Sequence, residues 1–100
     1  MARAGEFSLI EKYFAPLVKG APGAFGLKDD AALFAPDPAK DLVITKDALV
    51  EGRHFLSSDP AAQVAQKLLR VNLSDLAAKG SRPLHYLLAC AWPLDVSEQW

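Results

Sequence analysis

Residues 59–80, DPAAQVAQKLLRVNLSDLAAKG, carry a helical pattern with a start and a stop signal at its two ends. Asp59 followed by Pro60 is typical of a helix start, because aspartate caps helix N-termini and proline is favoured in the first turn. Gly80, with Pro83 just beyond it, is typical of a helix end. We therefore expect a helix that runs to about Lys79. Its predicted buried stripe consists of Val64, Leu68, Val71 and Leu76.

A second helical pattern lies near the N-terminus, where apolar residues of the segment 6–17 recur at helical spacing. Pro16 and Gly20 are expected to end this helix. The segment 20–30, GAPGAFGLKDD, is rich in glycine and predicts a loop. The apolar residues of the predicted helix are Phe7, Ile10, Phe14 and Leu17.

Three short apolar runs predict strands. The runs 31–35 and 42–45 are separated by the turn-forming residues 36–41, so they predict an antiparallel pair. The run 84–92, LHYLLACAW, is apolar throughout and predicts a central strand buried on both faces. The expected fold class is α+β, with helices packed on a mainly antiparallel sheet. Since the chain has 100 residues, we expect residues 1–100 to form one domain.

The last residues of the sequence predict the start of another helix. Asp95 has the character of an N-cap, and Glu98, three positions later, would complete a capping box. The sequence stops at Trp100, after only one turn of this predicted helix. We therefore expect the chain to be the first part of a longer protein.

Composition and charge limit the classes of partner. The net charge of −1 argues against a general nucleic-acid binder. No apolar run approaches the roughly 20 residues of a membrane span, and the N-terminus lacks the apolar segment of a secretory signal. The single cysteine, Cys90, lies in an apolar run and is expected to be buried. We expect a cytoplasmic protein without a nucleic-acid or membrane partner.

Several carboxylates lie where predicted elements end or border loops. Asp29 and Asp30 close the glycine-rich loop, Asp47 follows the predicted strand 42–45, and Asp75 borders the apolar stripe of the long helix. Converging carboxylates without a cysteine cluster suit Mg²⁺, which takes one or two carboxylates plus water and substrate phosphates. The alternative for Asp75 is an ordinary surface pair with Lys79, four positions later.

The remaining polar candidates allow more than one interpretation. His54, beside Phe55, is either a half-buried packing residue or a contact for a phosphate or ring ligand. His85 opens the apolar run 84–92 without acidic neighbours and is interpreted as structural. Lys67 and Arg70 are most simply solvated charges of the long helix.

Four segments together resemble one known family. They are GEFSLIEKYFAPL at 5–17, KDDAA at 28–32, TKDALVEGRHF at 45–55 and VNLSDLAAKGSRP at 71–83. These motifs are similar to the N-terminal part of the thiamine-monophosphate kinase family, within the AIR-synthase-related superfamily. The last motif is shared widely across the superfamily, so it indicates the fold. The motif at 45–55 is specific to the thiamine-phosphate branch.

The resemblance implies an ATP-dependent transfer of phosphate to thiamine monophosphate, which gives thiamine diphosphate. It implies several Mg²⁺ ions, with Asp30, Thr45, Asp47 and Asp75 as metal ligands and His54 as a substrate contact. No residue would act as a covalent catalyst, because the transfer would be direct and in line. The family's chain continues beyond this length, so 100 residues alone are expected to be inactive.

The resemblance also implies a homodimer, in which the N-terminal sheets of two chains join. Lys46 departs from the family pattern, which commonly has a small hydroxyl residue there. We expect its side chain to point away from the metals, because a cation beside them would weaken Mg²⁺ binding. Two other functions stay open: another ATP-dependent enzyme of the superfamily, and a non-catalytic dimerisation module.

Overall fold

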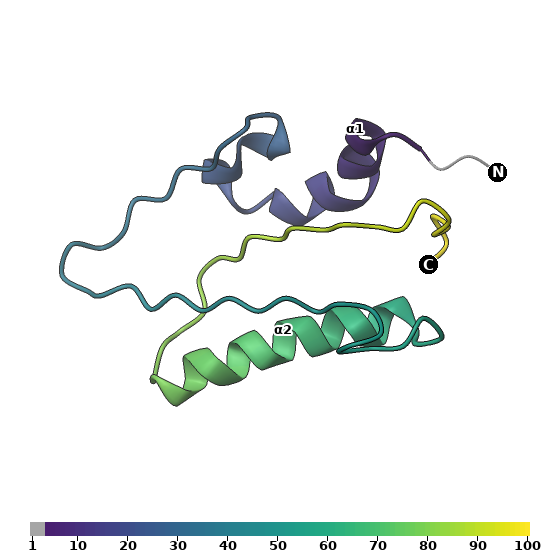
Figure 1. The fold of residues 1–100 in the computed structure, drawn as a ribbon. Helices are drawn as coiled ribbons and strands as arrows, with labels where there is room; N and C mark the ends of the chain where they lie inside the picture. Colours follow the sequence, from purple (N-terminus) through teal and green to yellow (C-terminus); the bar gives the residue numbers. More distant parts are fainter. Residues whose placement is uncertain (1–3) are drawn as a thin grey trace. The chain divides into compact units, whose positions relative to one another are not determined.

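The computed structural model describes residues 4–100, which divide into two compact units. The first unit contains residues 4–40 and 97–99, and the second contains residues 41–96 and 100. Helical segments dominate the first unit, whereas one long helix and extended chain make up the second (Figure 1).

The first unit begins with a helical stretch that changes pitch twice. Its parts are α1 (Glu6–Leu9), the π-helical η1 (Ile10–Phe14) and the 3₁₀-helical η2 (Ala15–Val18). The predicted helix at 6–17 is confirmed, but its predicted apolar stripe is only half right. Ile10 and Phe14 are half-buried, whereas Phe7 and Leu17 are 83% and 63% exposed. The α-helical period does not hold through π and 3₁₀ turns, which rotate successive side chains by different angles.

The glycine-rich segment contains a short 3₁₀ element, η3 (Pro22–Leu27), and a closed loop. Its conformation is irregular, because Phe25, Gly26 and Leu27 all have positive φ angles. Leu33 N–H donates a hydrogen bond of 2.8 Å to the carbonyl of Gly23. A Cβ on Gly23 would lie 1.9 Å from the oxygen of Leu33, so this approach requires glycine. The predicted loop is therefore only partly right, because 3₁₀ turns occupy Pro22–Leu27, and a backbone hydrogen bond closes the segment at its base.

The predicted helix at Asp95 does not form, because Glu98 makes other contacts. Its carboxylate accepts hydrogen bonds from the Tyr13 hydroxyl at 3.1 Å, the Lys12 ammonium at 3.4 Å and the Ala4 N–H at 3.4 Å. These contacts use the oxygens that a capping box would direct to the helix N-terminus. The hydrogen bond from Tyr13 is the largest of the effects that lower the pKa of Glu98.

Replacing Tyr13 with phenylalanine is expected to raise the pKa of Glu98 toward its ordinary value, because the leading stabiliser of the carboxylate is removed. A carboxyl whose pKa is depressed on folding stabilises the fold above its ordinary pKa, and this contribution is lost as pH falls through the lowered value. Titration of the Glu98 carboxyl carbon by NMR measures the change. Tyr86→Phe, in the other unit, is the control, and an unchanged Glu98 pKa in Tyr13→Phe would contradict this assignment.

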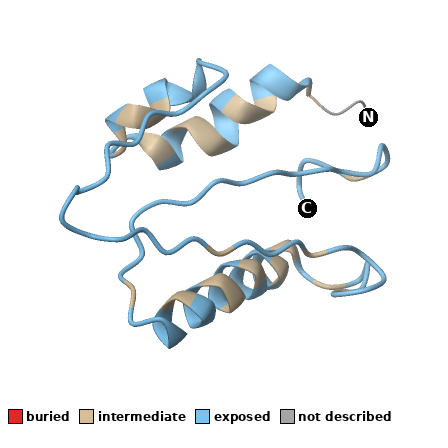
Figure 2. Ribbon diagram, turned by 60° about the vertical axis from the view of Figure 1, so that its left-hand side comes forward, coloured by how far each residue is buried: buried red, intermediate tan, exposed pale blue. Residues whose placement is uncertain are grey.

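In the second unit the long predicted helix is confirmed as α2 (Ala61–Ala78). Gly80 has a φ of 67° and follows the C-cap Lys79. Ser81 and Gly80 N–H groups donate to the carbonyls of Leu76 and Ala77, which is the Schellman arrangement. The predicted stripe is the least exposed side of the helix: Val64, Leu68, Val71 and Leu76 are all half-buried (Figure 2).

The helix start differs from the prediction by one position. Pro60 occupies the N-cap, and Asp59 lies before it. The Asp59 carboxylate accepts a hydrogen bond of 2.8 Å from Leu56 N–H, while Asp59 N–H donates to the Leu56 carbonyl. Asp59 therefore stabilises the turn that leads into α2 and leaves the first helical N–H groups without a side-chain cap.

The predicted sheet is wrong, because residues 4–100 contain no strand. The turn between the first two predicted strands does form, since Lys40 N–H donates to the Asp37 carbonyl. The flanking chain is extended but carries no ladder of hydrogen bonds, and an unpaired extended segment is not a strand. None of the described residues is buried, so no core covers the apolar runs. Their exposure is large at Ile44 (85%) and Leu87 (93%).

Among residues 4–100, no helix combines the length and the apolar character that a membrane span requires.

Candidate functional site

A tight loop at residues 50–55 lies beside α2 in the second unit. Arg53 and His54 N–H groups both donate to the carbonyl of Val50, at 3.1 and 2.8 Å. Gly52 has a φ of 79°, a conformation that a residue with a Cβ adopts at a cost. Gly52 N–H donates to the Phe55 carbonyl at 2.7 Å, and an isolated bridge joins Glu51 to Phe55. The loop is therefore closed by its own backbone.

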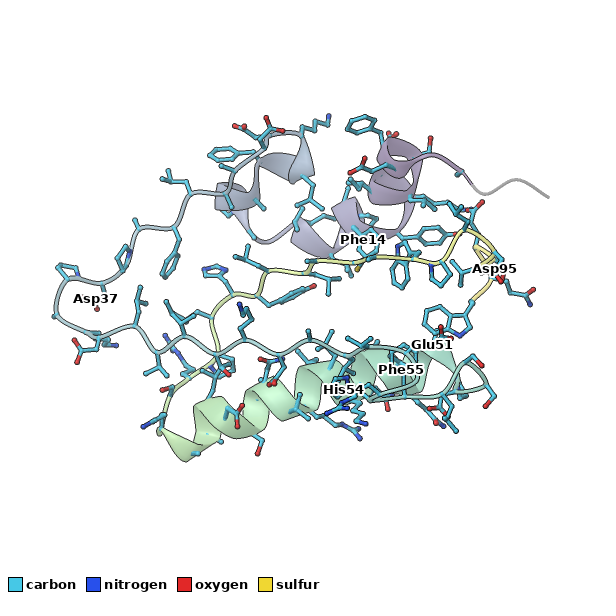
Figure 3. The ribbon with its side chains drawn as sticks, in the orientation of Figure 1. Phe14, Asp37, Glu51, His54, Phe55 and Asp95 are labelled. Atoms are coloured by element: carbon cyan, nitrogen blue, oxygen red, sulfur yellow. The ribbon has the colours of Figure 1, made fainter. Side chains whose placement is uncertain are left out.

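The ring of His54 is fixed by this loop. Its Nδ1 accepts a hydrogen bond of 2.9 Å from the N–H of Val50. In the neutral ring the proton must then be on Nε2, because a nitrogen that accepts this bond cannot carry hydrogen. Figure 3 shows His54, Phe55 and Glu51 together over the N-terminal half of α2. The nitrogen Nε2 is therefore the one available as a donor to a ligand.

Two open depressions adjoin this histidine. The first, of about 240 Å³, is lined by the loop and by Asp59. The second, of about 210 Å³, lies between the loop and the first turns of α2. Both are lined by His54, Phe55 and Asp59, and Lys67 is on the wall of the second. The loop thus presents a histidine, an aromatic ring and charged groups of both signs on one concave surface.

Two of the predicted metal ligands meet at the other end of the same extended segment. The Thr45 hydroxyl donates to Oδ2 of Asp75 at 3.4 Å. This contact replaces the alternative surface pair, since Asp75 and Lys79 form no salt bridge within the described residues. Asp47 is exposed and lies two positions after Thr45 on this segment. The structure therefore brings Thr45 and Asp75 together.

Asp30 belongs to the first unit and is described only against its own neighbours. It is exposed, and its N–H donates to Oδ1 of Asp29 at 2.8 Å. The closed loop between Gly23 and Leu33 therefore carries both carboxylates.

The oxygen donors that are brought together suit Mg²⁺ by their chemistry. Among residues 4–100 no three acidic, histidine or cysteine side chains lie close enough to hold a metal ion. Mg²⁺ does not require such a cage, because it usually keeps several waters and binds one or two carboxylates together with substrate phosphates. The carboxylate of Asp75 and the hydroxyl of Thr45 fit that donor set.

Sequence reasoning interpreted Lys67 as a solvated charge of the helix and missed its contact with the loop. Its ammonium donates a hydrogen bond to the backbone carbonyl of His54. The spacing of residues on α2 gave no signal for this contact, because the partner is a backbone atom of a separate loop. The expectation for Cys90 was also wrong, since this residue is exposed. Partial desolvation raises the pKa of its thiol, which disfavours the reactive thiolate.

The comparisons with known proteins agree with one another. Residues 28–100 match the family described as AIR synthase related protein, N-terminal domain. The thiamine-monophosphate kinase of Caulobacter vibrioides is 53% identical over 88 residues, which cover 88% of this chain and 25% of that protein. The thiamine-monophosphate kinase of Escherichia coli strain K12 is 44% identical over 97 residues, or 96% of this chain and 30% of that protein.

A third relative extends the range of organisms. The thiamine-monophosphate kinase of Haemophilus influenzae is 38% identical over 97 residues, which cover 96% of this chain and 29% of that protein. No solved structure matches the chain. The chain spans between a quarter and a third of the length of these curated relatives.

Proposed function

Because the chain belongs to the family of AIR synthase related proteins, N-terminal domain, we propose that it is the metal- and substrate-binding part of a thiamine-monophosphate kinase. The whole protein would transfer the γ-phosphate of ATP to thiamine monophosphate and release thiamine diphosphate. Residues 1–100 would be its AIR-synthase-related N-terminal domain and would be inactive alone. The whole protein would be cytoplasmic and would act as a homodimer.

The observation that carries this proposal is the pairing of Thr45 with Asp75. The Thr45 hydroxyl and the Asp75 carboxylate of α2 lie 3.4 Å apart. The extended segment that carries Thr45 also carries Asp47. Thr45, Asp47 and Asp75 would hold Mg²⁺, and Asp30 is assigned the same role from the resemblance of its motif. Bound Mg²⁺ supplies positive charge that neutralises the phosphates. The residues themselves orient the phosphates, and orientation supplies much of the rate in phosphoryl transfer.

His54 is proposed to contact thiamine monophosphate. Its Nδ1 is bound to Val50 N–H, so Nε2 is free to donate to the substrate from the wall of the depression at residues 52–59. Phe55 on the same wall would exclude water from one side of the ligand. The proposed interaction lowers the KM for thiamine monophosphate and leaves proton transfer to other groups.

The test is release of ADP by the whole protein that contains this chain, measured with a panel of acceptors. We expect release that requires both thiamine monophosphate and Mg²⁺. Release with a different acceptor only would assign the protein to another enzyme of the superfamily. An absence of both turnover and Mg²⁺–nucleotide binding would instead support a non-catalytic dimerisation module. Either result would contradict the proposal.

Lys46 provides a separate check on the metal site. We expect Lys46→Thr to leave the Mg²⁺ affinity of the whole protein within about twofold, because a solvated ammonium that points away is screened by water. Calorimetric titration with Mg²⁺ in the presence of ATP measures this. A tenfold gain in affinity, about 1.4 kcal/mol, would mean that the ammonium faces the metals.

A further inference from the structure

α2 is connected to the proposed site segment at two places. Asp75 accepts a hydrogen bond from Thr45 near the C-terminal end of the helix, and Lys67 donates to the His54 carbonyl nearer its N-terminal end. The segment thus runs antiparallel to the helix, and it follows α2 along its length in both views (Figures 1 and 2).

The lengths of the two elements agree with these contacts. Lys67 and Asp75 are eight positions apart, which corresponds to about 12 Å along an α-helix. The extended residues from Thr45 to Val50 cover about 16 Å at the rise of an extended chain. The turn after Val50 then brings the chain back, so that the carbonyl of His54 meets Lys67. Each end of the segment therefore has a hydrogen bond to the helix.

We propose that Lys67 is a positioning residue, which holds the loop 50–55 on α2 and so orients the ring of His54. This inference rests on the proposed function in one respect, namely that His54 contacts the substrate. The loop's own hydrogen bonds close it on Val50, and apart from Lys67 no helix side chain donates to its backbone within the described residues. An ammonium that bonds to a carbonyl binds the loop through its backbone, whatever the side chain at position 54.

The orientation of His54 depends on the same loop geometry. The bond from Val50 N–H to Nδ1 closes only while the turn at Gly52 is formed. Loss of the Lys67 contact removes a bond from the helix to the loop at His54, so the turn can open more often. The ring then loses its single tautomer, because Nδ1 no longer has a fixed donor.

The test uses the whole protein that contains this chain, with Lys67→Met, which keeps the apolar stem and removes the charge. We expect amide exchange of Val50 to rise about tenfold, the change for loss of a hydrogen bond of ordinary strength. The ¹⁵N shifts of the His54 ring are expected to move toward a mixture of tautomers. Lys67→Arg should restore both signals, because a guanidinium also donates to a carbonyl.

Lys79→Met is the matched control. Lys79 is also an exposed lysine, but it is the C-cap of α2, twelve positions after Lys67. It should leave the Val50 and His54 signals unchanged. Unchanged signals in Lys67→Met, or an equal change in Lys79→Met, would overturn the inference. If Lys67→Met does not fold, failure of Lys67→Arg to give the parent signals would overturn it as well.

Kinetics of the whole protein separate this inference from the proposed function. With Lys67→Met we expect KM for thiamine monophosphate to rise about tenfold while kcat stays within about twofold. This pattern is typical when an interaction that binds the substrate and the transition state equally is lost. A change in the NMR signals without a change in KM would support Lys67 as the residue that holds the loop, and it would contradict the substrate role of His54.

Discussion

Replacement of Asp47 by asparagine is expected to lower kcat of the whole protein by at least about 100-fold, more than the 10–100-fold typical of residues that only support a ligand. Asparagine keeps the shape of the side chain but removes the negative charge. A neutral amide oxygen compensates the positive charge of Mg²⁺ poorly, so Mg²⁺ binds less well. The phosphates then lose the charge stabilisation on which phosphoryl transfer depends. Formation of thiamine diphosphate at saturating ATP measures the effect.

Asp41→Asn is the matched control for Asp47→Asn. Asp41 is an exposed aspartate that lies just before the same extended segment. Its replacement changes the net charge equally, and we expect an effect on kcat within about twofold, as for surface changes away from a site. A similar loss in both variants, or full activity in Asp47→Asn, would remove Asp47 from the metal site.

The second large effect is expected for Gly23→Ala. The new Cβ would lie 1.9 Å from the backbone oxygen of Leu33, so the chain must shift to accept it. That shift breaks the hydrogen bond from Leu33 N–H to Gly23, which closes the loop around Asp29 and Asp30. We expect protection of the Leu33 amide from exchange to fall at least about tenfold. Mg²⁺ affinity of the whole protein should fall as well, because Asp30 is displaced.

Gly20→Ala is the control for this variant. A Cβ on Gly20 has no atom within 4 Å, and no positive φ is recorded there. Alanine at this position is expected to leave the exchange protection of the Leu33 amide unchanged. It should stabilise the fold slightly, by about 0.4–1 kcal/mol, because alanine lowers the conformational entropy of the unfolded chain. Retention of Leu33 protection in Gly23→Ala would show that the loop is not closed at its base.

The helical stretch near the N-terminus and α2 were predictable from the sequence, whereas the sheet and the helix at Asp95 were predicted wrongly. The stripe Val64, Leu68 and Val71 and the stop signal at Gly80 act within a few residues, so a local pattern was sufficient for α2. A strand needs hydrogen bonds from a partner, and the apolar runs at 42–45 and 84–92 find none among the described residues. The apolar pattern predicted strands, and this was wrong because the pattern carries no information about a pairing partner.

The candidate site shows the same difference between local patterns, which the sequence reveals, and contacts between distant segments, which it does not. The types and positions of the aspartates and His54 made them candidates, their roles are what the resemblance of their motifs implies, and these roles stay predictions. The contacts between them involve distant parts of the sequence: Thr45 meets Asp75, and Lys67 meets a backbone carbonyl of the loop. Glu98 is a further case, since its predicted helix cap is replaced by contacts with Tyr13 and Lys12, which are remote in the sequence. Spacing cannot predict which distant groups will meet.

The central claim, that four oxygen-bearing residues hold the metal for phosphate transfer, is tested most directly with Mn²⁺ in place of Mg²⁺. Carboxylate sites accept both ions, and Mn²⁺ broadens the NMR signals of nearby nuclei. In the whole protein with ATP, we predict selective broadening of the amides of Asp30, Thr45, Asp47 and Asp75. Broadening centred elsewhere, or absent from these four residues at saturating Mn²⁺, would contradict the account.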